Sequence, residues 1–118
     1  MSNEETNGQK GDCTKAKVLT TDDVFQLLSN YRRREVIKLL RDHGEMTQRE
    51  LAEAIDGEYK NVYISLHQCH IPKLVRADVL TEKRDTYALG PNASELLAYI
   101  DGPIRELNLR SIPGFITP

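Results

Sequence analysis

The sequence predicts a mainly α-helical protein of the α+β class. From Thr20 onward, apolar residues recur at intervals of three and four, which is the spacing of amphipathic helices. Only "VLTEKRDTYAL", residues 79–89, departs from this pattern, with two short runs of strand-forming residues around a polar turn. An aromatic content of 6% without Trp indicates a core built from Leu, Ile and Val.

Capping residues delimit the first expected helices. Thr20 precedes a helix with Asp in its first turn, and a second helix starts after Asn30 and stops at Gly44. Thr47 and Glu50 have the spacing of a capping box, in which each side chain satisfies a free backbone N–H of the other residue. A short third helix is therefore expected directly after Thr47.

The stretch "NVYISLHQCHIPKL" is expected to form a fourth helix. Val62, Leu66 and Cys69 have the spacing of an inward edge. Pro72 lacks an N–H and its ring clashes with the preceding turn, which predicts a kink or break near His70 and a short second helix through residue 77. After the hairpin, "NASELLAYI" is typical of a capped amphipathic helix.

This order of elements is that of a winged helix-turn-helix domain with a small β-hairpin wing and an additional C-terminal helix. The extended residues Glu45 and Met46 are candidates for a third strand beside the wing. We expect a disordered polar leader at 1–17, the winged domain at 20–90, a C-terminal helix that can serve dimerisation at 91–110, and a tail at 111–118.

Composition excludes several functional classes. No apolar run is long enough to span a bilayer and the N-terminus lacks a secretory segment, so a cytoplasmic location is expected. Two cysteines, Cys13 and Cys69, do not form a disulfide framework. Because no Gly-rich phosphate loop, nucleophile elbow or scaffolded acid pair appears, we predict no enzymatic activity, no cofactor and no small-molecule substrate.

The charge pattern favours nucleic acid as a partner despite a net charge of −2. Residues 59–77 contain Lys60, Lys73 and Arg76 but no Asp or Glu, whereas 47–58 are acidic. A local basic patch is sufficient for contact with phosphate. With Val62 and Leu66 inward, the outward face of the fourth helix carries side chains that can read bases in a major groove: Lys60, Asn61, Tyr63, Ile64, His67 and Gln68. A solvated helix face has a similar composition.

Further DNA contacts are expected outside this helix. Lys83 and Arg84 at the hairpin tip are placed to grip phosphate, although charged turn residues are as often simply solvated. Gln48 and Arg49, in the first turn of the preceding helix, can reach the DNA backbone. The cluster Arg32–Arg34 either contacts phosphate or pairs within its own domain, for example with Glu35 or a neighbouring helix end.

A homodimer is expected because two helices carry apolar stripes in excess of what one small core needs. The residues assigned to this interface are Val24, Phe25, Leu28, Leu96, Leu97 and Ile100. Palindromic half-sites would then lie about one helical turn apart.

A metal site is the weaker interpretation of the same stretch. His67 and His70, three residues apart, can share a helix face, while Cys69 points toward the core in the expected register. Zinc needs more converging ligands than this pair supplies, and a lone buried Cys is usually a small hydrophobe. No metal is therefore assigned, with His67 and His70 as the alternative ligands.

Several motifs also carry a family resemblance. The segment "VFQLLSNYRRREVIKLLRDHGEMTQRELAEAI" resembles the opening of arsenic-repressor-like (ArsR-like) regulators. More closely, "RRREVIKLL", "TQRELAEAI" and "VYISLHQCHIPKLVRADVL" resemble a group of uncharacterised winged-helix proteins of haloarchaea. Asp78 stands where that group usually has Gly, at an expected left-handed helix end. The resemblance implies an archaeal, often dimeric DNA-binding transcriptional regulator.

Three functional hypotheses follow. The first is a transcriptional regulator that binds double-stranded DNA and reads its major groove with the helix around 59–70. It is expected to be a repressor rather than an activator. The second is a winged-helix module for protein–protein interaction, in which Tyr63 and Ile64 meet another protein. The third is a metal-sensing repressor.

Overall fold

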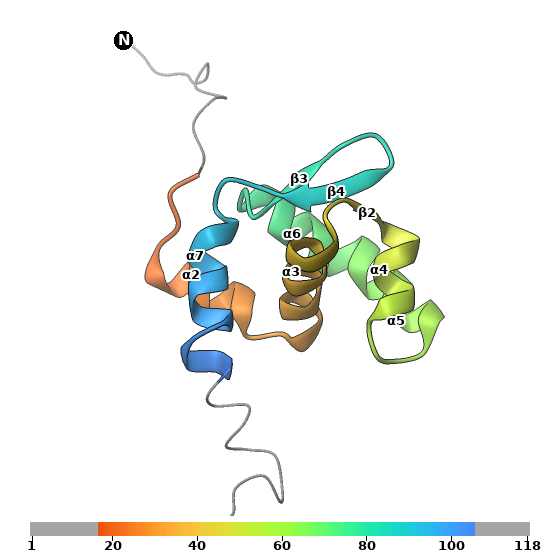
Figure 1. Ribbon diagram of the computed structural model, residues 1–118, viewed down its shortest axis with the longest axis horizontal. Helices are drawn as coiled ribbons and strands as arrows, with labels where there is room; N and C mark the ends of the chain where they lie inside the picture. The colour runs from red at the N-terminus through yellow and green to blue at the C-terminus, as the bar shows by residue number, and fades with distance from the viewer. Residues whose placement is uncertain (1–16, 106–118) are drawn as a thin grey trace, which may run out of the picture.

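The computed structural model of the protein describes residues 17–105 (Figure 1). The expected leader, apart from Lys17, and the expected tail at 111–118 lie outside the described residues. The elements in chain order are α2 (Thr21–Leu28), α3 (Tyr31–His43), β2 (Met46–Thr47), α4 (Gln48–Ala54), α5 (Tyr59–Ser65), the π-helical turn η2 (Leu66–His70), α6 (Ile71–Arg76), β3 (Leu80–Glu82), β4 (Thr86–Leu89) and α7 (Ala93–Ile100). The fold is therefore mainly helical and of the α+β class, as predicted.

Local hydrogen bonds start two of the helices where the sequence predicts. The backbone N–H of Asp23 donates to the hydroxyl of Thr20 at 3.0 Å, and the N–H of Thr20 donates to the Asp23 carboxylate at 3.0 Å. Thr47 and Glu50 form the same reciprocal pair, at 2.9 and 3.1 Å. These bonds satisfy N–H groups that the first helical turn leaves without partners.

The strands form one three-stranded antiparallel sheet in the order β2–β4–β3. Met46 pairs with Tyr87, and Leu80 pairs with Leu89. The third strand expected at Glu45 and Met46 is present one residue later, at Met46–Thr47. The sheet lies against the helices on one side of the domain (Figure 1). The β3–β4 turn projects beside the α4–α5 region.

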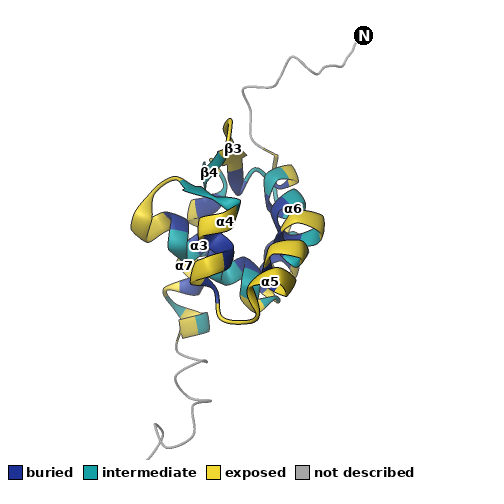
Figure 2. Cartoon of the chain, turned by 90° about the vertical axis from the view of Figure 1, so that its right-hand side faces the viewer, coloured by how far each residue is buried: buried dark blue, intermediate teal, exposed yellow. Residues whose placement is uncertain are grey.

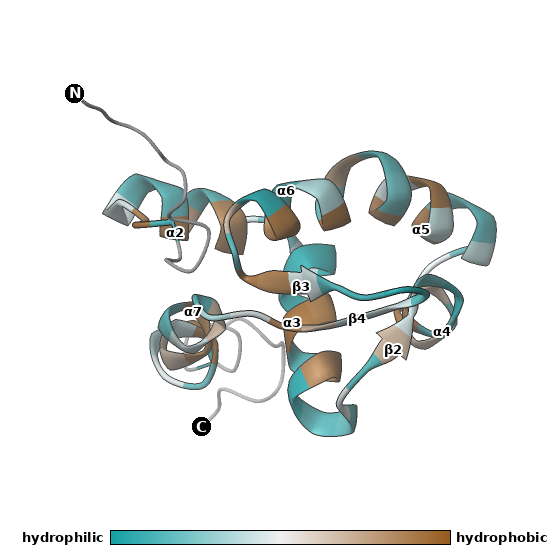
Figure 3. Ribbon diagram, turned by 90° about the horizontal axis from the view of Figure 1, so that it is seen from above, coloured by the Kyte–Doolittle hydropathy of each residue, from teal (hydrophilic) through white to brown (hydrophobic). Residues whose placement is uncertain are grey.

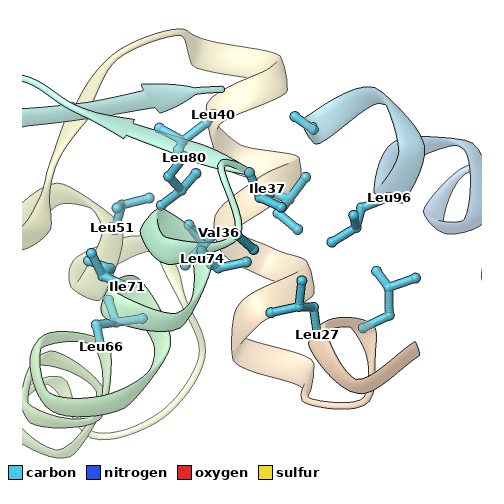
Figure 4. Close-up of a cluster of buried hydrophobic side chains, with 14 of the residues drawn as sticks. Leu27, Val36, Ile37, Leu40, Leu51, Leu66, Ile71, Leu74, Leu80 and Leu96 are labelled. Atoms are coloured by element: carbon cyan, nitrogen blue, oxygen red, sulfur yellow. The ribbon is translucent and has the colours of Figure 1, made fainter. Parts of the chain in front are cut away.

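The core is centred on α3. Val36 and Ile37 are fully buried, and α3 lies between the row formed by α5 and α6 and the outer helix α7 (Figure 3). Side chains from α2, α4, η2, α6, β3 and α7 converge on this helix to form the core (Figure 4). Its largest fully buried members are Ile37, Leu51, Leu66, Leu74, Leu80 and Leu96.

A π-helical turn, not a break, lies where a kink or break was expected near His70, and the short second helix expected after it is present as α6. The backbone stays helical through Leu66 and Ile71, and the N–H of Ile71 donates to the carbonyl of Leu66, five residues back. Pro72, which has no N–H, falls in the first turn of α6. A π turn holds one more residue than an α turn, so the chain can absorb the proline without breaking the helix.

The π turn also corrects the expected inward edge. Val62 and Leu66 are fully buried, as predicted, but the next buried position is His70 rather than Cys69. Cys69 is half-buried at the side of the helix.

Two smaller outcomes concern helix ends. Asp78 has a φ of 60° and ends α6 in the left-handed conformation expected there, which Asp adopts more readily than most residues. Asn92 does not cap α7; its side-chain amide instead donates to the carbonyls of Lys17 and Ala77 at 2.6 and 2.9 Å. Within residues 17–105, none of the helices combines the length and the apolar character that crossing a membrane requires.

Candidate functional site

The outward face of α5 and η2 is the largest set of predicted site residues that the structure brings together. All six side chains assigned to it are exposed, while Val62 and Leu66 between them are fully buried. Figure 2 shows this exposed face along α5. The exposed residues are Lys60, Asn61, Tyr63, Ile64, His67 and Gln68.

Apolar and aromatic groups form part of this face. Ile64 is 46% exposed and Tyr63 37% exposed, although both have large apolar surfaces. The rings of Tyr59 and Tyr63, one helical turn apart, lie 5.7 Å from each other between centroids. The face can therefore make apolar contacts as well as hydrogen bonds, which suits a partner surface better than water alone.

The two candidates in α4 have different roles. The side-chain amide of Gln48 donates to the backbone carbonyl of Tyr63 at 3.4 Å, which is a long hydrogen bond that links α4 to α5. Gln48 is accordingly half-buried, whereas Arg49 is exposed. Gln48 supports the position of α5, and Arg49 takes part in none of the ion pairs found within residues 17–105.

The hairpin tip is also divided. The ammonium of Lys83 lies 2.8 Å from the carboxylate of Glu45, which also accepts from the hydroxyl of Thr86 at 3.2 Å. The hydrogen bond from Lys83 has the largest effect, and together with that from Thr86 it lowers the pKa of Glu45 below its ordinary value. Arg84 is exposed and takes part in none of the ion pairs found within residues 17–105.

A groove lies between the η2–α6 segment and the sheet. It has a volume of about 340 Å³, and its apolar lining includes Ile71, Pro72 and Val75. Arg76 and Tyr87 also line it, and the sequence did not assign either of them to the site. Tyr87 could be placed only once the pairing of β4 with β2 was known, because no local pattern brings it to α6.

Each residue of the arginine cluster on α3 makes at least one contact inside the domain. Nε of Arg33 donates to the carbonyl of Leu27 and Nη2 donates to that of Gln26, both at 2.8 Å. Nη1 of Arg34 donates to the carbonyl of Leu28 at 2.5 Å. The expected pairing with Glu35 is not observed, because Glu35 pairs with Lys38. The expected contact with a neighbouring helix end is present, because Arg33 and Arg34 cap the last turn of α2.

The cluster also holds η2 and α5 in place. Nη1 of Arg33 lies 3.1 Å from Nδ1 of the buried His70, and Nη1 of Arg32 donates to the hydroxyl of Ser65 at 2.7 Å. An arginine cannot accept a hydrogen bond, so Nδ1 of His70 is the unprotonated acceptor of a neutral ring. Burial lowers the pKa of His70, and the charges of Arg33, Arg32 and Lys73 lower it further.

This arrangement removes the basis for the metal alternative. Nδ1 of His70 is bonded to Arg33 in the interior, whereas His67 is exposed on the outer face, so the two rings do not converge. No group of three or more His, Cys, Asp or Glu residues suited to a metal ion is found among residues 17–105.

Four of the six residues assigned to a dimer interface belong to the core of a single chain, which corrects that assignment. Val24, Leu28, Leu96 and Ile100 are at most 7% exposed, so they have no surface to offer a partner. The core uses these stripes because α2 and α7 both pack on α3. Of the other two, Leu97 is half-buried and Phe25 is 50% exposed.

Tyr99, which the sequence did not single out, contacts Phe25. Their ring centroids lie 5.4 Å apart in an edge-to-face arrangement. The apolar surface left on α2 and α7 is thus the pair Phe25 and Tyr99.

Fold and site together define a small α+β domain with an exposed polar and aromatic helix face beside a short hairpin. Residues 25–89 match the family described as a domain of unknown function (DUF7344), and they make up more than half of the 118-residue chain. The chain belongs to this family. Among curated proteins, none matches the chain at a significant level.

Proposed function

We propose that this protein is a winged helix-turn-helix transcriptional regulator that binds double-stranded DNA. The observation that carries the proposal is the outward face of α5 and η2, where all six predicted base-reading side chains are exposed together. In this proposal α4 and α5 form the helix-turn-helix, and the β3–β4 hairpin is the wing.

The chemistry of the face supports contact with a major groove. The amides of Asn61 and Gln68 can pair with adenine, Lys60 can donate to guanine, and Ile64 can contact a thymine methyl. The segment 59–77 adds Lys73 and Arg76 without an acid, so the surface along the helix attracts phosphate although the whole chain is slightly acidic. Covering promoter DNA in this way would repress transcription.

The wing contributes less charge than its sequence suggests. Glu45 neutralises Lys83, so Arg84 is the cation at the tip that is available to phosphate. We therefore expect Arg84 to be the more important of the two for affinity, through a backbone contact that is independent of DNA sequence.

The test is fluorescence anisotropy of a duplex pool with random cores, titrated across a range of salt. The variant Lys60→Ala/Tyr63→Ala should lose about tenfold in affinity, and its plot of log affinity against log salt should be shallower by about 0.9. The matched control is Tyr31→Ala/Lys38→Ala, which removes the same two residue types from α3, away from the proposed DNA-binding face. If the folded wild-type protein binds no DNA at any salt, the proposal is wrong.

A protein partner is the second candidate, because Tyr59, Tyr63 and Ile64 expose aromatic and apolar area on one face. Tyr is enriched at protein interfaces, where its ring is buried and its hydroxyl stays bonded. Such binding would depend little on salt, whereas affinity for DNA falls steeply with added salt because binding releases counterions from the DNA. The salt series therefore separates the two candidates.

We also propose that the regulator is a homodimer, now through Phe25 and Tyr99 in place of the buried residues. Two exposed rings in edge-to-face contact, one on α2 and one on α7, offer an apolar patch. Sedimentation should show a dimer that Phe25→Asp converts to monomer. A monomeric wild-type protein at high concentration would exclude this assembly.

A further inference from the structure

A cavity lined by several basic side chains lies away from α5. It has a volume of about 470 Å³ and opens between α3 and the end of α7. Figure 3 places α7 on the opposite side of the molecule from α5, so this cavity is separate from the proposed DNA-binding face. Its size is in the range of pockets that hold small molecules.

One face of α3 forms the first wall. Tyr31, Arg34, Lys38 and Arg41 recur at intervals of three and four, so they stand in a row along the helix. The other face of the same helix carries Val36 and Ile37, which are fully buried. The cavity wall is thus held by a helix whose orientation the core determines.

The charges of the cavity do not balance. Its two carboxylates are both engaged, because Glu35 pairs with Lys38 at 2.9 Å and Asp101 pairs with Arg41. Arg34 and Arg105 also line the cavity, and neither takes part in any ion pair found within residues 17–105. The cavity therefore carries an excess of positive charge in a chain with a net charge of −2.

Arg34 is preorganised for an anion. Its Nη1 donates to the carbonyl of Leu28, which fixes the guanidinium at the end of α2. A guanidinium has five N–H donors in a planar fork, so most remain available for a carboxylate or phosphate. Fixing the donor before binding reduces the entropy that a ligand must offset.

The remaining lining is apolar or a neutral donor. Ile100 and Ile104 come from the α7 end, and Tyr31 comes from the start of α3. Burial raises the pKa of the Tyr31 phenol, and the charges of Glu35 and Asp56 raise it further, so this hydroxyl stays protonated at neutral pH. An occupant that suits this lining has an apolar body and one anionic group.

We propose that this cavity binds a small organic anion that carries one carboxylate or phosphate group on an apolar body. Arg34 and Arg105 hold the anionic group, and Tyr31 and Ile104 contact the body. The proposal does not depend on DNA binding. It rests on the cavity and its uncompensated cations alone.

Two-dimensional NMR of the nitrogen-15-labelled full chain tests it, with phenyl phosphate and benzoate as the anionic probes. Saturable shifts are expected at amides in 31–41 and 100–105. Comparison of the two probes shows which anionic group the cavity prefers. Benzyl alcohol, which keeps the ring and lacks the charge, should shift the same amides at least about tenfold more weakly.

The matched variants are Arg105→Glu and Arg84→Glu, which reverse the charge of one exposed arginine in the cavity and one on the hairpin. Arg105→Glu should weaken the anionic probe by about tenfold or more, and Arg84→Glu should leave it unchanged. Because Arg105 is exposed, its variant should keep the dispersed spectrum of a folded chain. Equal binding of benzyl alcohol, shifts centred on the hairpin or α5, or unchanged binding by Arg105→Glu would each overturn the proposal.

Discussion

Nη1 of Arg33 lies 3.1 Å from Nδ1 of His70, and this buried contact joins α3 to the π turn of the helix that carries the candidate site. The same guanidinium caps α2 through Leu27 and Gln26. One side chain thus connects three helices. Its charge is tolerated in the interior because helix-end carbonyls and a neutral imidazole satisfy its donors.

Replacing Arg33 with methionine should destabilise the fold strongly. The variant keeps a long apolar stem but leaves the carbonyl of Leu27 and the Nδ1 atom of His70 buried without a donor. We expect the free energy of unfolding to fall by about 3 kcal/mol, as is typical for the loss of several hydrogen bonds to a charged group. Urea denaturation measures it. Arg32→Met is the control, because Arg32 makes one hydroxyl contact and should cost about 1 kcal/mol.

The free energy of unfolding should also decrease as pH is lowered through the range where histidine titrates. Burial lowers the pKa of His70 from its ordinary value of 6.5, so the unfolded chain takes up this proton at higher pH than the folded chain. The contribution of His70 is therefore complete above about pH 7 and is lost as pH falls from there toward the folded pKa. Protonation would also place a second positive charge against Arg33.

His70→Gln tests the origin of this effect. Glutamine retains an acceptor for Arg33 but does not titrate, so the variant should lose less stability than the wild type between about pH 7 and pH 5. The measurement is the urea midpoint as a function of pH. Parallel curves for the two proteins would show that protonation of His70 does not cause the loss of stability at low pH.

Features that depend on neighbouring residues were predictable from the sequence. The pairs Thr20–Asp23 and Thr47–Glu50 lie three residues apart, so each cap is set by local geometry, and the structure confirms both. The hairpin at 79–89 was predictable for the same reason. The exposed face of α5 followed from the burial of Val62 and Leu66, which are four residues apart.

Features that depend on distant residues were not predictable. Periodicity assumes 3.6 residues per turn, and the π turn shifted the buried position from Cys69 to His70. The role of Arg33 depends on His70, which lies 37 residues away in the chain. Four of the residues assigned to the dimer interface were wrong, because counting apolar stripes cannot show that side chains such as Val24 and Leu96 are buried within one chain.

Gly57 should resist substitution more than Gly44, although both have a positive φ. At Gly57 the φ is 130°, and an added Cβ would lie 2.9 Å from Cγ2 of the fully buried Val62. At Gly44 the φ is 80°, and a Cβ would meet nothing within 4 Å. Both alanine variants incur backbone strain, and Gly57→Ala also displaces the start of α5.

We expect Gly57→Ala to lower the free energy of unfolding by about 2 kcal/mol more than Gly44→Ala, since overpacking adds to strain only at Gly57. Thermal or urea denaturation of the two variants measures the difference. Equal destabilisation would mean that the loop at Gly57 can move away from Val62 at little cost.

The pairing of Lys83 with Glu45 makes a prediction that rests on the proposed DNA binding. Glu45→Gln removes the carboxylate that neutralises Lys83, so the hairpin tip should present two free cations in place of one. Affinity for the duplex pool should rise about threefold at low salt, and the dependence of log affinity on log salt should steepen by about 0.9. Glu53→Gln, which removes an exposed acid from α4 without releasing a lysine, controls for general charge. If both variants bind alike, the wing does not contact the DNA backbone through Lys83.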